Sequence, residues 1–309
     1  MIACVGESLV DFTPVTVAGR LDGFRVRPGG SPCNVAVGVA RLGHESGFAG
    51  RMSDDLFGRM LAAHLVENGV ATHLAPRGRE PTALAFVAGA EGEAAYDFRL
   101  VGTAAAGLAP GDLSLERFAD LEAVHFGSLG VAVRPSREAV LGLARALRGG
   151  PLLTFDPNVR PEVVPDWPEY RAALAEAAEL ADLVRASEAD LRAWGVRPEL
   201  GHDQALIVTA GPAGSRLHLA GRTVTCPAAP CRVVDTVGAG DAYMAALLVA
   251  LAERRALDRA ALGRLGDDDW LAVIRFAAVA AALTCERTGA DPPARAEVDA
   301  RLAAWSSAG

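Results

Sequence analysis

A Gly-rich heptapeptide with an acidic residue at each end, 235–241 (DTVGAGD), is the segment of this chain best suited to chemistry. The apolar run 231–234 before it predicts the end of a strand, and the apolar run 242–252 after it predicts a helix. Gly238 and Gly240 would let the backbone approach a ligand, and the N–H groups at the start of the helix would face an anion. The segment therefore predicts an anion hole with a carboxylate base beside it.

Other functions of Gly-rich turns fit the surrounding residues less well. A dinucleotide-binding fingerprint, as in an NAD-linked oxidoreductase, would need a third glycine where Tyr243 stands. A Walker P-loop needs a lysine, and this chain has none, because all 30 of its basic residues are Arg. The same absence excludes protein kinases and Schiff-base catalysis. An ordinary strand–turn–helix with a capping Asp would leave the acidic residue at the other end of the turn unexplained.

The heptapeptide resembles the C-terminal signature of the ribokinase-like (PfkB) carbohydrate kinase family. The range 28–43 (PGGSPCNVAVGVARLG) resembles the N-terminal signature of the same family. The ranges 5–11, 156–160 and 208–211 also match segments of these kinases, so the resemblance covers nearly the whole sequence. It implies one ribokinase-like α/β kinase domain over residues 1–309, which transfers a phosphoryl group from ATP to a sugar hydroxyl.

Length and composition agree with a soluble globular protein. A chain of 309 residues can form one large α/β domain with a substantial core. Charged residues interrupt the long apolar runs and no secretion signal is evident, so we expect no membrane partner and a cytoplasmic location. The net charge of −8 argues against nucleic acid as a partner. Five scattered cysteines predict neither a disulfide framework nor a zinc site.

Strands and helices alternate along most of the chain, which predicts a doubly wound, mostly parallel sheet flanked by helices. A hairpin, 82–87 and 94–99 with a polar tip at 91–93, breaks the alternation. The resemblance implies that segments of approximately 12–25 and 80–105 form a small β-sheet lid, through which a homodimer is expected. The other expected strands are 2–5, 123–126, 152–155, 183–185 and 205–209, and the expected helices are 34–42, 54–69, 137–148, 167–181, 188–194, 242–252 and two at the C-terminal end.

The proposed catalytic residues lie in the heptapeptide. We expect Asp241 to accept the proton of the sugar hydroxyl, and the N–H groups of Gly238, Ala239 and Gly240 to hold the transferring phosphoryl oxygens. Because Asp241 opens a helix, its pKa is expected to be lowered if it is shifted at all. A weak base is sufficient when the transition state is loose, because the hydroxyl acidifies as its bond to phosphorus forms.

Sugar binding requires polar groups that converge on neighbouring hydroxyls. Asp11, at the exit of the first strand, and Asn34 match sugar-binding positions of the family, although alone they would be interpreted as a turn residue and a helix cap. Arg160, in Asp-Pro-Asn-Val-Arg, resembles an arginine that family members direct at the substrate or phosphate. The sugar-binding residues that the resemblance implies are Asp11, Gly29, Gly30, Asn34, Arg99 and Arg160.

The nucleotide site is expected at the end of the strand 205–209, and 281–290 resembles the stretch beside the adenine. Mg²⁺ should accompany ATP. Related kinases often have Asn and Glu at the outer positions of the segment that is Ser187-Glu188-Ala189-Asp190 here, where they organise Mg²⁺ through water; Glu188 and Asp190 both stay open for this role. Carbonyls around Asp235 and Val237 and from 284–289 can bind K⁺ in this family. The expected nucleotide-binding residues are Ser187, Glu188, Thr209, Gly211, Gly214 and Gly240.

Among sugar kinases the likeness is closest to bacterial fructokinases, and it is carried by the ranges 29–38, 92–99 and 156–161. The expected reaction is phosphorylation of a primary hydroxyl of a ketohexose, with fructose first. The alternative is 2-keto-3-deoxygluconate, whose kinases share the Asp-x-Asn-x-Arg pattern, followed by ribose and nucleosides. A sugar-binding sensor without catalytic activity is the non-enzymatic alternative, although such a protein would have no need to keep Asp241.

Overall fold

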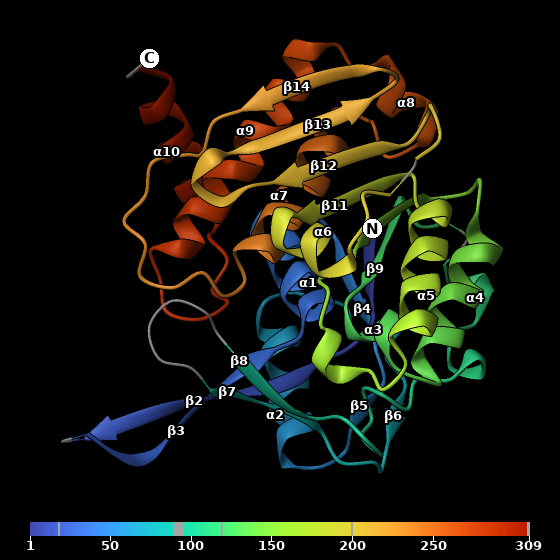
Figure 1. Ribbon diagram of the computed structural model, residues 1–309, viewed down its shortest axis with the longest axis vertical. Coiled ribbons are helices and arrows are strands. Elements are labelled where there is room, and N and C mark those ends of the chain that lie inside the picture. Colours follow the sequence, from blue (N-terminus) through green and yellow to red (C-terminus); the bar gives the residue numbers. More distant parts are fainter. Residues whose placement is uncertain (18, 89–94, 119, 199, 308–309) are drawn as a thin grey trace.

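The computed structural model describes residues 1–309 except 18, 89–94, 119, 199 and 308–309. In this part of the chain, the largest element is an eight-stranded sheet that is parallel apart from an antiparallel hairpin at one edge (Figure 1). In spatial order its strands are β14 (Arg222–Cys226), β13 (Ser215–Leu219), β12 (Ala205–Thr209), β11 (Leu183–Ser187), β10 (Leu152–Asp156), β9 (Ala123–Gly127), β1 (Ile2–Val5) and β4 (Ser46–Ala49).

Helices cover both faces of this sheet, which explains why strands such as β1, Ile2-Ala3-Cys4-Val5, are continuous apolar runs. The expected doubly wound, mostly parallel α/β fold is confirmed. One face is covered by α1 (Ser31–Arg41), α2 (Leu56–Glu67), α7 (Ala239–Glu253), α8 (Arg259–Arg264), α9 (Asp267–Cys285) and α10 (Arg295–Ser307). The other is covered by α3 (Leu129–Ala132), α4 (Ser136–Leu147), α5 (Trp167–Leu180) and α6 (Glu188–Trp194).

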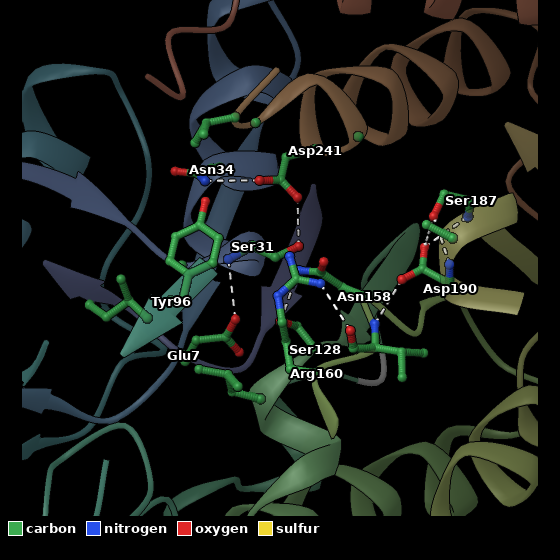
Figure 2. A pocket seen from close by; sticks show the side chains of 18 of the residues that line it. Glu7, Ser31, Asn34, Tyr96, Ser128, Asn158, Arg160, Ser187, Asp190 and Asp241 are labelled. Atoms are coloured by element: carbon green, nitrogen blue, oxygen red, sulfur yellow. Dashed lines mark hydrogen bonds between the residues drawn. The ribbon is translucent and has the colours of Figure 1, made fainter. Parts of the chain in front are cut away.

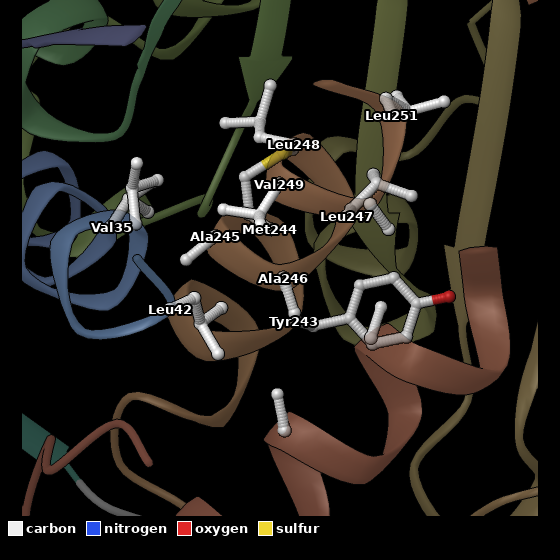
Figure 3. Packing of buried hydrophobic residues seen from close by; sticks show 14 of the residues in the cluster. Val35, Leu42, Tyr243, Met244, Ala245, Ala246, Leu247, Leu248, Val249 and Leu251 are labelled. Carbon is white, nitrogen blue, oxygen red and sulfur yellow. The ribbon is translucent and has the colours of Figure 1, made fainter. Parts of the chain in front are cut away.

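Helix α7 lies inside its layer, with α1 and α9 beside it (Figure 3). Every residue from Ala242 to Leu251 is buried, as expected for a helix that is apolar on all sides. A Cβ atom at Gly38 of α1 would lie 2.6 Å from the Cβ of Ala245. The two helices can therefore approach this closely because α1 has no side chain at their contact.

A second sheet of four strands projects from the large one, at the lower left of Figure 1. The expected small separate sheet is thus confirmed, although the hairpin tip 91–93 lies outside the described residues. On one face Phe12, Phe24 and Phe86 form an aromatic cluster with ring centroids 4.9–6.0 Å apart, and Phe57 of α2 packs against Phe12. The strands, in order, are β3 (Arg20–Gly29), β2 (Leu9–Val17), β7 (Ala83–Ala88) and β8 (Ala95–Arg99), and a separate short pair is β5 (Met52–Ser53) with β6 (Arg77–Gly78).

The segment before the glycine-rich turn is a loop, so the prediction of a strand end at 231–234 was wrong. Pro227 and Pro230, just before this segment, supply no backbone N–H that could donate to a neighbouring strand. The N–H of Val234 donates to the carbonyl of Cys285, 2.8 Å away, and not to a neighbouring strand. The edge of the sheet is formed instead by β13 and β14, which the sequence-based prediction missed, as it missed β4 and the short helix α8.

Within the described residues, no helix combines the length and the apolar character that crossing a membrane requires.

Candidate active site

Two cavities meet at the N-terminus of α7, beyond the carboxyl ends of the parallel strands, where open α/β sheets bind ligands. The first cavity, of about 480 Å³, is lined largely by polar side chains. The second, of about 920 Å³, has more apolar walls. The residues common to both walls are Arg185, Ser187, Thr236 and Gly240. Two ligands, one in each cavity, would therefore lie next to each other at the first turn of α7.

Asp241 faces the first cavity and is held by two residues of α1 (Figure 2). The hydroxyl of Ser31 donates to its Oδ1 at 2.6 Å, and Nδ2 of Asn34 donates to its Oδ2 at 2.8 Å. Burial raises the pKa of Asp241, against the opposing effects of these hydrogen bonds and of Arg185 and Arg160. The prediction of a lowered pKa was wrong, because desolvation outweighs the helix terminus.

The turn before Asp241 is shaped by glycine and by Asp235. Gly238 has φ 76°, and a Cβ there would lie 2.5 Å from that of Ala290. Asp235 accepts hydrogen bonds from the N–H groups of Val237 at 3.1 Å and Gly289 at 2.7 Å. The first acidic residue of the motif thus fixes the turn and joins it to the loop after α9. The N–H of Ala239 donates to the carbonyl oxygen of Thr236 at 3.3 Å. Gly240 and Asp241 stand in the first turn of α7, where backbone N–H groups have no partner within the helix.

The other carboxylates that line the first cavity include those of Asp11 of β2 and Glu7. Burial, and then the charge of Asp241, raise the pKa of Asp11 to about 7. Burial also raises the pKa of Glu7 to about 7, although it accepts hydrogen bonds from the N–H groups of Ser31 and Gly130, each at 3.2 Å. Both groups can change charge near neutral pH.

Backbone at 29–30 closes the wall between these carboxylates. Gly30 lines the cavity with φ 103°, and a Cβ there would lie 2.6 Å from the carbonyl oxygen of Glu7. A Cβ at Gly29 would collide with the carboxylate of Asp11. The structure thus places Gly29 beside Asp11 and Gly30 beside Glu7, and only Gly30 lines the cavity.

Arg160 lines the first cavity, with its guanidinium carbon 5.9 Å from the centre of the Tyr96 ring. Arg99, in contrast, is exposed and pairs with Asp97 on the other face of β8. Successive side chains of a strand point to opposite faces, so Tyr96 and Phe98 face the cavity and Arg99 does not. The structure thus brings Arg160 to the predicted sugar-binding residues and leaves Arg99 outside them.

The predicted nucleotide residues meet in the wall of the second cavity, which contains Ser187, Thr209, Gly211 and Gly214. Helix α9 supplies the opposite wall, and its residues there are Ala278, Ala281, Ala282 and Cys285. Gly214 has φ 87°, and a Cβ there would collide with the carbonyl of Cys226. The first residues of the predicted stretch 281–290 therefore lie in the wall of this cavity.

Asp190 and Glu188, both candidates for metal binding, lie in different surroundings. Asp190 is buried and lines the first cavity. Its carboxylate caps α6 by accepting from the N–H of Ser187 at 2.8 Å, and it also accepts from the N–H of Val159 at 2.8 Å. Glu188 lines neither cavity and pairs with Arg216 at 3.0 Å. In the described part of the chain, no three His, Cys, Asp or Glu side chains are placed to hold a metal ion. Because both oxygens of Asp190 already accept backbone N–H groups, contact with Mg²⁺ through water suits this carboxylate better than direct ligation.

Arg185 of β11 is a site residue that sequence analysis missed. It is buried, lines both cavities, and donates to Asp156 at 2.8 Å and to the hydroxyl of Thr209 at 2.7 Å. Burial alone would lower its pKa, but the carboxylates of Asp156, Asp190 and Asp241 raise it, so the guanidinium stays charged. A charged residue within a central strand was the available signal. Glu7, Ser31, Tyr96 and Asn158 were missed as well.

Similarity to known proteins extends over nearly the whole chain. The pfkB family carbohydrate kinase model matches residues 1–297. "Fructokinase-2" of Solanum habrochaites is 33% identical over 310 residues, which cover 94% of this chain and 92% of the relative. The structure of a fructokinase with bound ATP from Xylella fastidiosa has 28% identity and a TM-score of 0.89, and the match covers 99% of this chain and 98% of that one.

Two structures of a fructokinase from Vibrio cholerae, each with a TM-score of 0.84, also match. The first, with fructose, ADP and a calcium ion, is 27% identical, and the match covers 97% of this chain and 98% of that one. The second, a double mutant with fructose, ADP and a potassium ion, is 26% identical, and the match covers 97% of both chains. The chain described here belongs to the pfkB family of carbohydrate kinases.

Proposed function

We propose that this protein transfers the γ-phosphoryl group of ATP to a primary hydroxyl of fructose. The observation that carries the proposal is the position of Asp241, whose carboxylate is fixed by Ser31 and Asn34 in the polar cavity, one residue from Gly240 in the shared wall. Similarity to fructokinases over nearly the whole chain supports fructose and ATP as substrates.

In this mechanism Asp241 takes the proton of the attacking hydroxyl. Its raised pKa makes it a stronger base than an exposed aspartate, and the hydrogen bonds from α1 keep its carboxylate oriented. The N–H groups of Gly238 and Gly240 stabilise the negative charge of the transferring group, whereas that of Ala239, expected in the same role, already donates to the carbonyl of Thr236. The transfer then requires little movement, because the acceptor and the phosphoryl group meet at one helix terminus.

The sugar is held by Asp11, Asn34, Gly30 and Arg160, which surround the first cavity. Nδ2 of Asn34 is engaged by Asp241, and its amide oxygen can accept from a sugar hydroxyl. Asp11 accepts from another hydroxyl. The adenine occupies the second cavity against α9, with the phosphates directed toward Gly240.

Mg²⁺ bound with ATP supplies charge neutralisation of the phosphates. Asp190 would contact it through water, because both of its oxygens already hold backbone N–H groups. K⁺ would bind carbonyls of the turn at 235–237 and of the loop 284–289, which the hydrogen bond from Gly289 to Asp235 joins. The potassium ion bound in a structure of the Vibrio cholerae fructokinase supports K⁺ as a ligand.

The small sheet would act as a lid over the first cavity and mediate a homodimer. Its face opposite the cavity carries the aromatic cluster of Phe12, Phe24 and Phe86, and Phe24 and Val26 are exposed there, so a second copy would remove apolar surface from water. Cytoplasmic location is supported by the five cysteines, all of which are free thiols.

The experiment that tests this function is ADP release with ATP, Mg²⁺ and a panel of ketoses, aldoses, keto acids and nucleosides. Fructose should give the highest kcat/KM. The second candidate is 2-keto-3-deoxygluconate, because the guanidinium of Arg160 in the first cavity could pair with its carboxylate. Release with nucleosides alone would contradict the sugar assignment, and binding of fructose without turnover would indicate a sensor.

A further inference from the structure

Arg185 stands where the two cavities join, at the carboxyl end of the central strand β11. On the face toward α7, Leu183 belongs to the apolar core, and two residues later the same face carries this arginine. A Cβ at Gly240 would lie 2.6 Å from Nη1 of Arg185. Glycine at position 240 therefore lets the guanidinium lie against the first turn of α7.

The protein leaves this guanidinium incompletely paired. An arginine has five N–H donors. Nη1 donates to Asp156 and Nη2 to Thr209, whereas Nε is buried and has no hydrogen-bond partner. A buried donor without an acceptor is costly, and the side chain that carries this one lines both cavities. An anion that enters from either cavity would find a charged donor already in place.

The charges of the cavity walls also favour a role for Arg185 in binding an anion. Among the described residues that line the two cavities, the cationic side chains are those of Arg160 and Arg185, and Arg185 alone lines both. The carboxylates in these walls are those of Glu7, Asp11, Glu162, Asp190 and Asp241. An excess of negative charge would repel a triphosphate unless a cation stands on its path.

We propose that Arg185 is a catalytic residue that binds the transferring phosphoryl group of ATP at the junction of the two cavities. This inference rests on the proposed transfer from ATP. The guanidinium donates to phosphoryl oxygens from the strand side, while the N–H groups of α7 donate from the helix side. Because charge on these oxygens changes during transfer, donors held rigidly around them lower the barrier without having to reorient.

A purely structural role for Arg185 would be to join β10, β11 and β12 through Asp156 and Thr209. The two roles differ in which ligand loses affinity on substitution. A structural defect would weaken adenosine and ATP together, because both need the second cavity. Loss of a phosphate contact would weaken ATP and spare adenosine.

The test is calorimetric titration of ATP and of adenosine, without sugar, into wild type, Arg185→Gln and the double variant Asp156→Asn, Arg185→Gln. The double variant also removes the charge of Asp156, so the carboxylate is not left buried without its ion-pair partner. A loss of ATP affinity that persists in the double variant is therefore due to the missing arginine. We expect both variants to bind ATP about 10- to 100-fold more weakly and adenosine as tightly as wild type. With fructose, kcat should fall about 10²- to 10³-fold. Arg185→Lys, which keeps the charge, should retain more ATP affinity than Arg185→Gln, and it tests the proposal if Gln prevents folding.

A matched control is the pair of Arg259 and Asp182 at the opposite end of β11, where the arginine also donates to a buried carboxylate. Arg259→Gln should lower thermal stability and leave the ratio of ATP to adenosine affinity unchanged. An unchanged ratio in both Arg185 variants, or normal turnover in the double variant, would overturn the proposal. Wild type that binds ATP but phosphorylates no sugar would instead contradict the proposed function alone.

Discussion

The hydroxyl of Ser31 and the carboxylate of Asp241 are joined by a hydrogen bond of 2.6 Å, although 210 positions separate them in the sequence. Asn34, one turn further along α1, reaches the other oxygen of the same carboxylate. The N-terminal and C-terminal signature motifs therefore meet at one functional group. The position of the base depends on how closely α1 packs against α7.

Gly38 controls that packing, and Gly38→Ala should disturb it. The added methyl group would lie 2.6 Å from the Cβ of Ala245, so the helices must separate. We expect the free energy of unfolding to fall by about 1–3 kcal/mol. We also expect kcat to fall, because Ser31 and Asn34 would move relative to Asp241. Urea denaturation and steady-state kinetics measure the two effects.

The control is Gly142→Ala in α4, where an added Cβ meets no atom within 4 Å. This change should raise stability by about 0.5–1 kcal/mol, because alanine is the better helix former, and leave kcat unchanged. If Gly38→Ala were as stable and as active as Gly142→Ala, the close contact between α1 and α7 would not matter as described.

Asp11→Asn should weaken fructose binding and remove its dependence on pH. The pKa of Asp11 is about 7, and the ionised form is the better acceptor for a hydroxyl, so wild-type affinity should rise from about pH 6 to about pH 8. The amide has no such transition and should lose about 1.5–3 kcal/mol of binding free energy at high pH. Calorimetry across this range measures both. Asp22→Asn, at an exposed position of β3, should match wild type, whereas an unaltered pH profile in Asp11→Asn would remove Asp11 from the sugar site.

Glu7→Gln should change how stability depends on pH. The pKa of Glu7 is about 7 in the folded protein against an ordinary 4.5, so the folded state binds the proton more tightly than the unfolded chain. This stabilisation is fully present below about pH 4.5 and is lost as pH rises through about 7, at a cost of up to about 3 kcal/mol. Glutamine cannot ionise, so the variant should lack this loss.

Urea denaturation of both proteins at about pH 5 and pH 8 isolates the contribution of Glu7, because other groups titrate equally in each. The exposed Glu116 supplies the control, and Glu116→Gln should follow wild type. Parallel stability curves for wild type and Glu7→Gln would show that burial does not shift this carboxyl group.

Much of the site could be predicted because its residues stand in contiguous motifs. The structure brings Asp11, Asn34, Arg160 and Asp241 to one cavity, as the two signatures and the Asp-Pro-Asn-Val-Arg segment indicated, and their roles stay predictions. The alternation of strands and helices was equally readable, because buried parallel strands leave long apolar runs.

The remainder depended on tertiary contacts that no local pattern encodes. Arg99 and Tyr96 stand on the same strand, and which of them faces the cavity is decided by how β8 pairs with β7. The pKa of Asp241 depends on burial beneath α1, which the helix terminus alone did not reveal. The sequence shows Arg185 as a charged residue in a strand, but not that Asp156, Thr209 and Gly240 converge around it.

The central claim is that Asp241 is the base of the phosphoryl transfer, and Asp241→Asn tests it most directly. Asparagine keeps the size of the side chain and can accept from Ser31 or Asn34, but it cannot take a proton. The measurement is kcat with ATP and fructose, together with the calorimetric affinity for fructose. The account predicts that kcat falls by about 10²- to 10⁴-fold while fructose affinity changes little. Turnover near that of wild type, or loss of fructose binding, would contradict it.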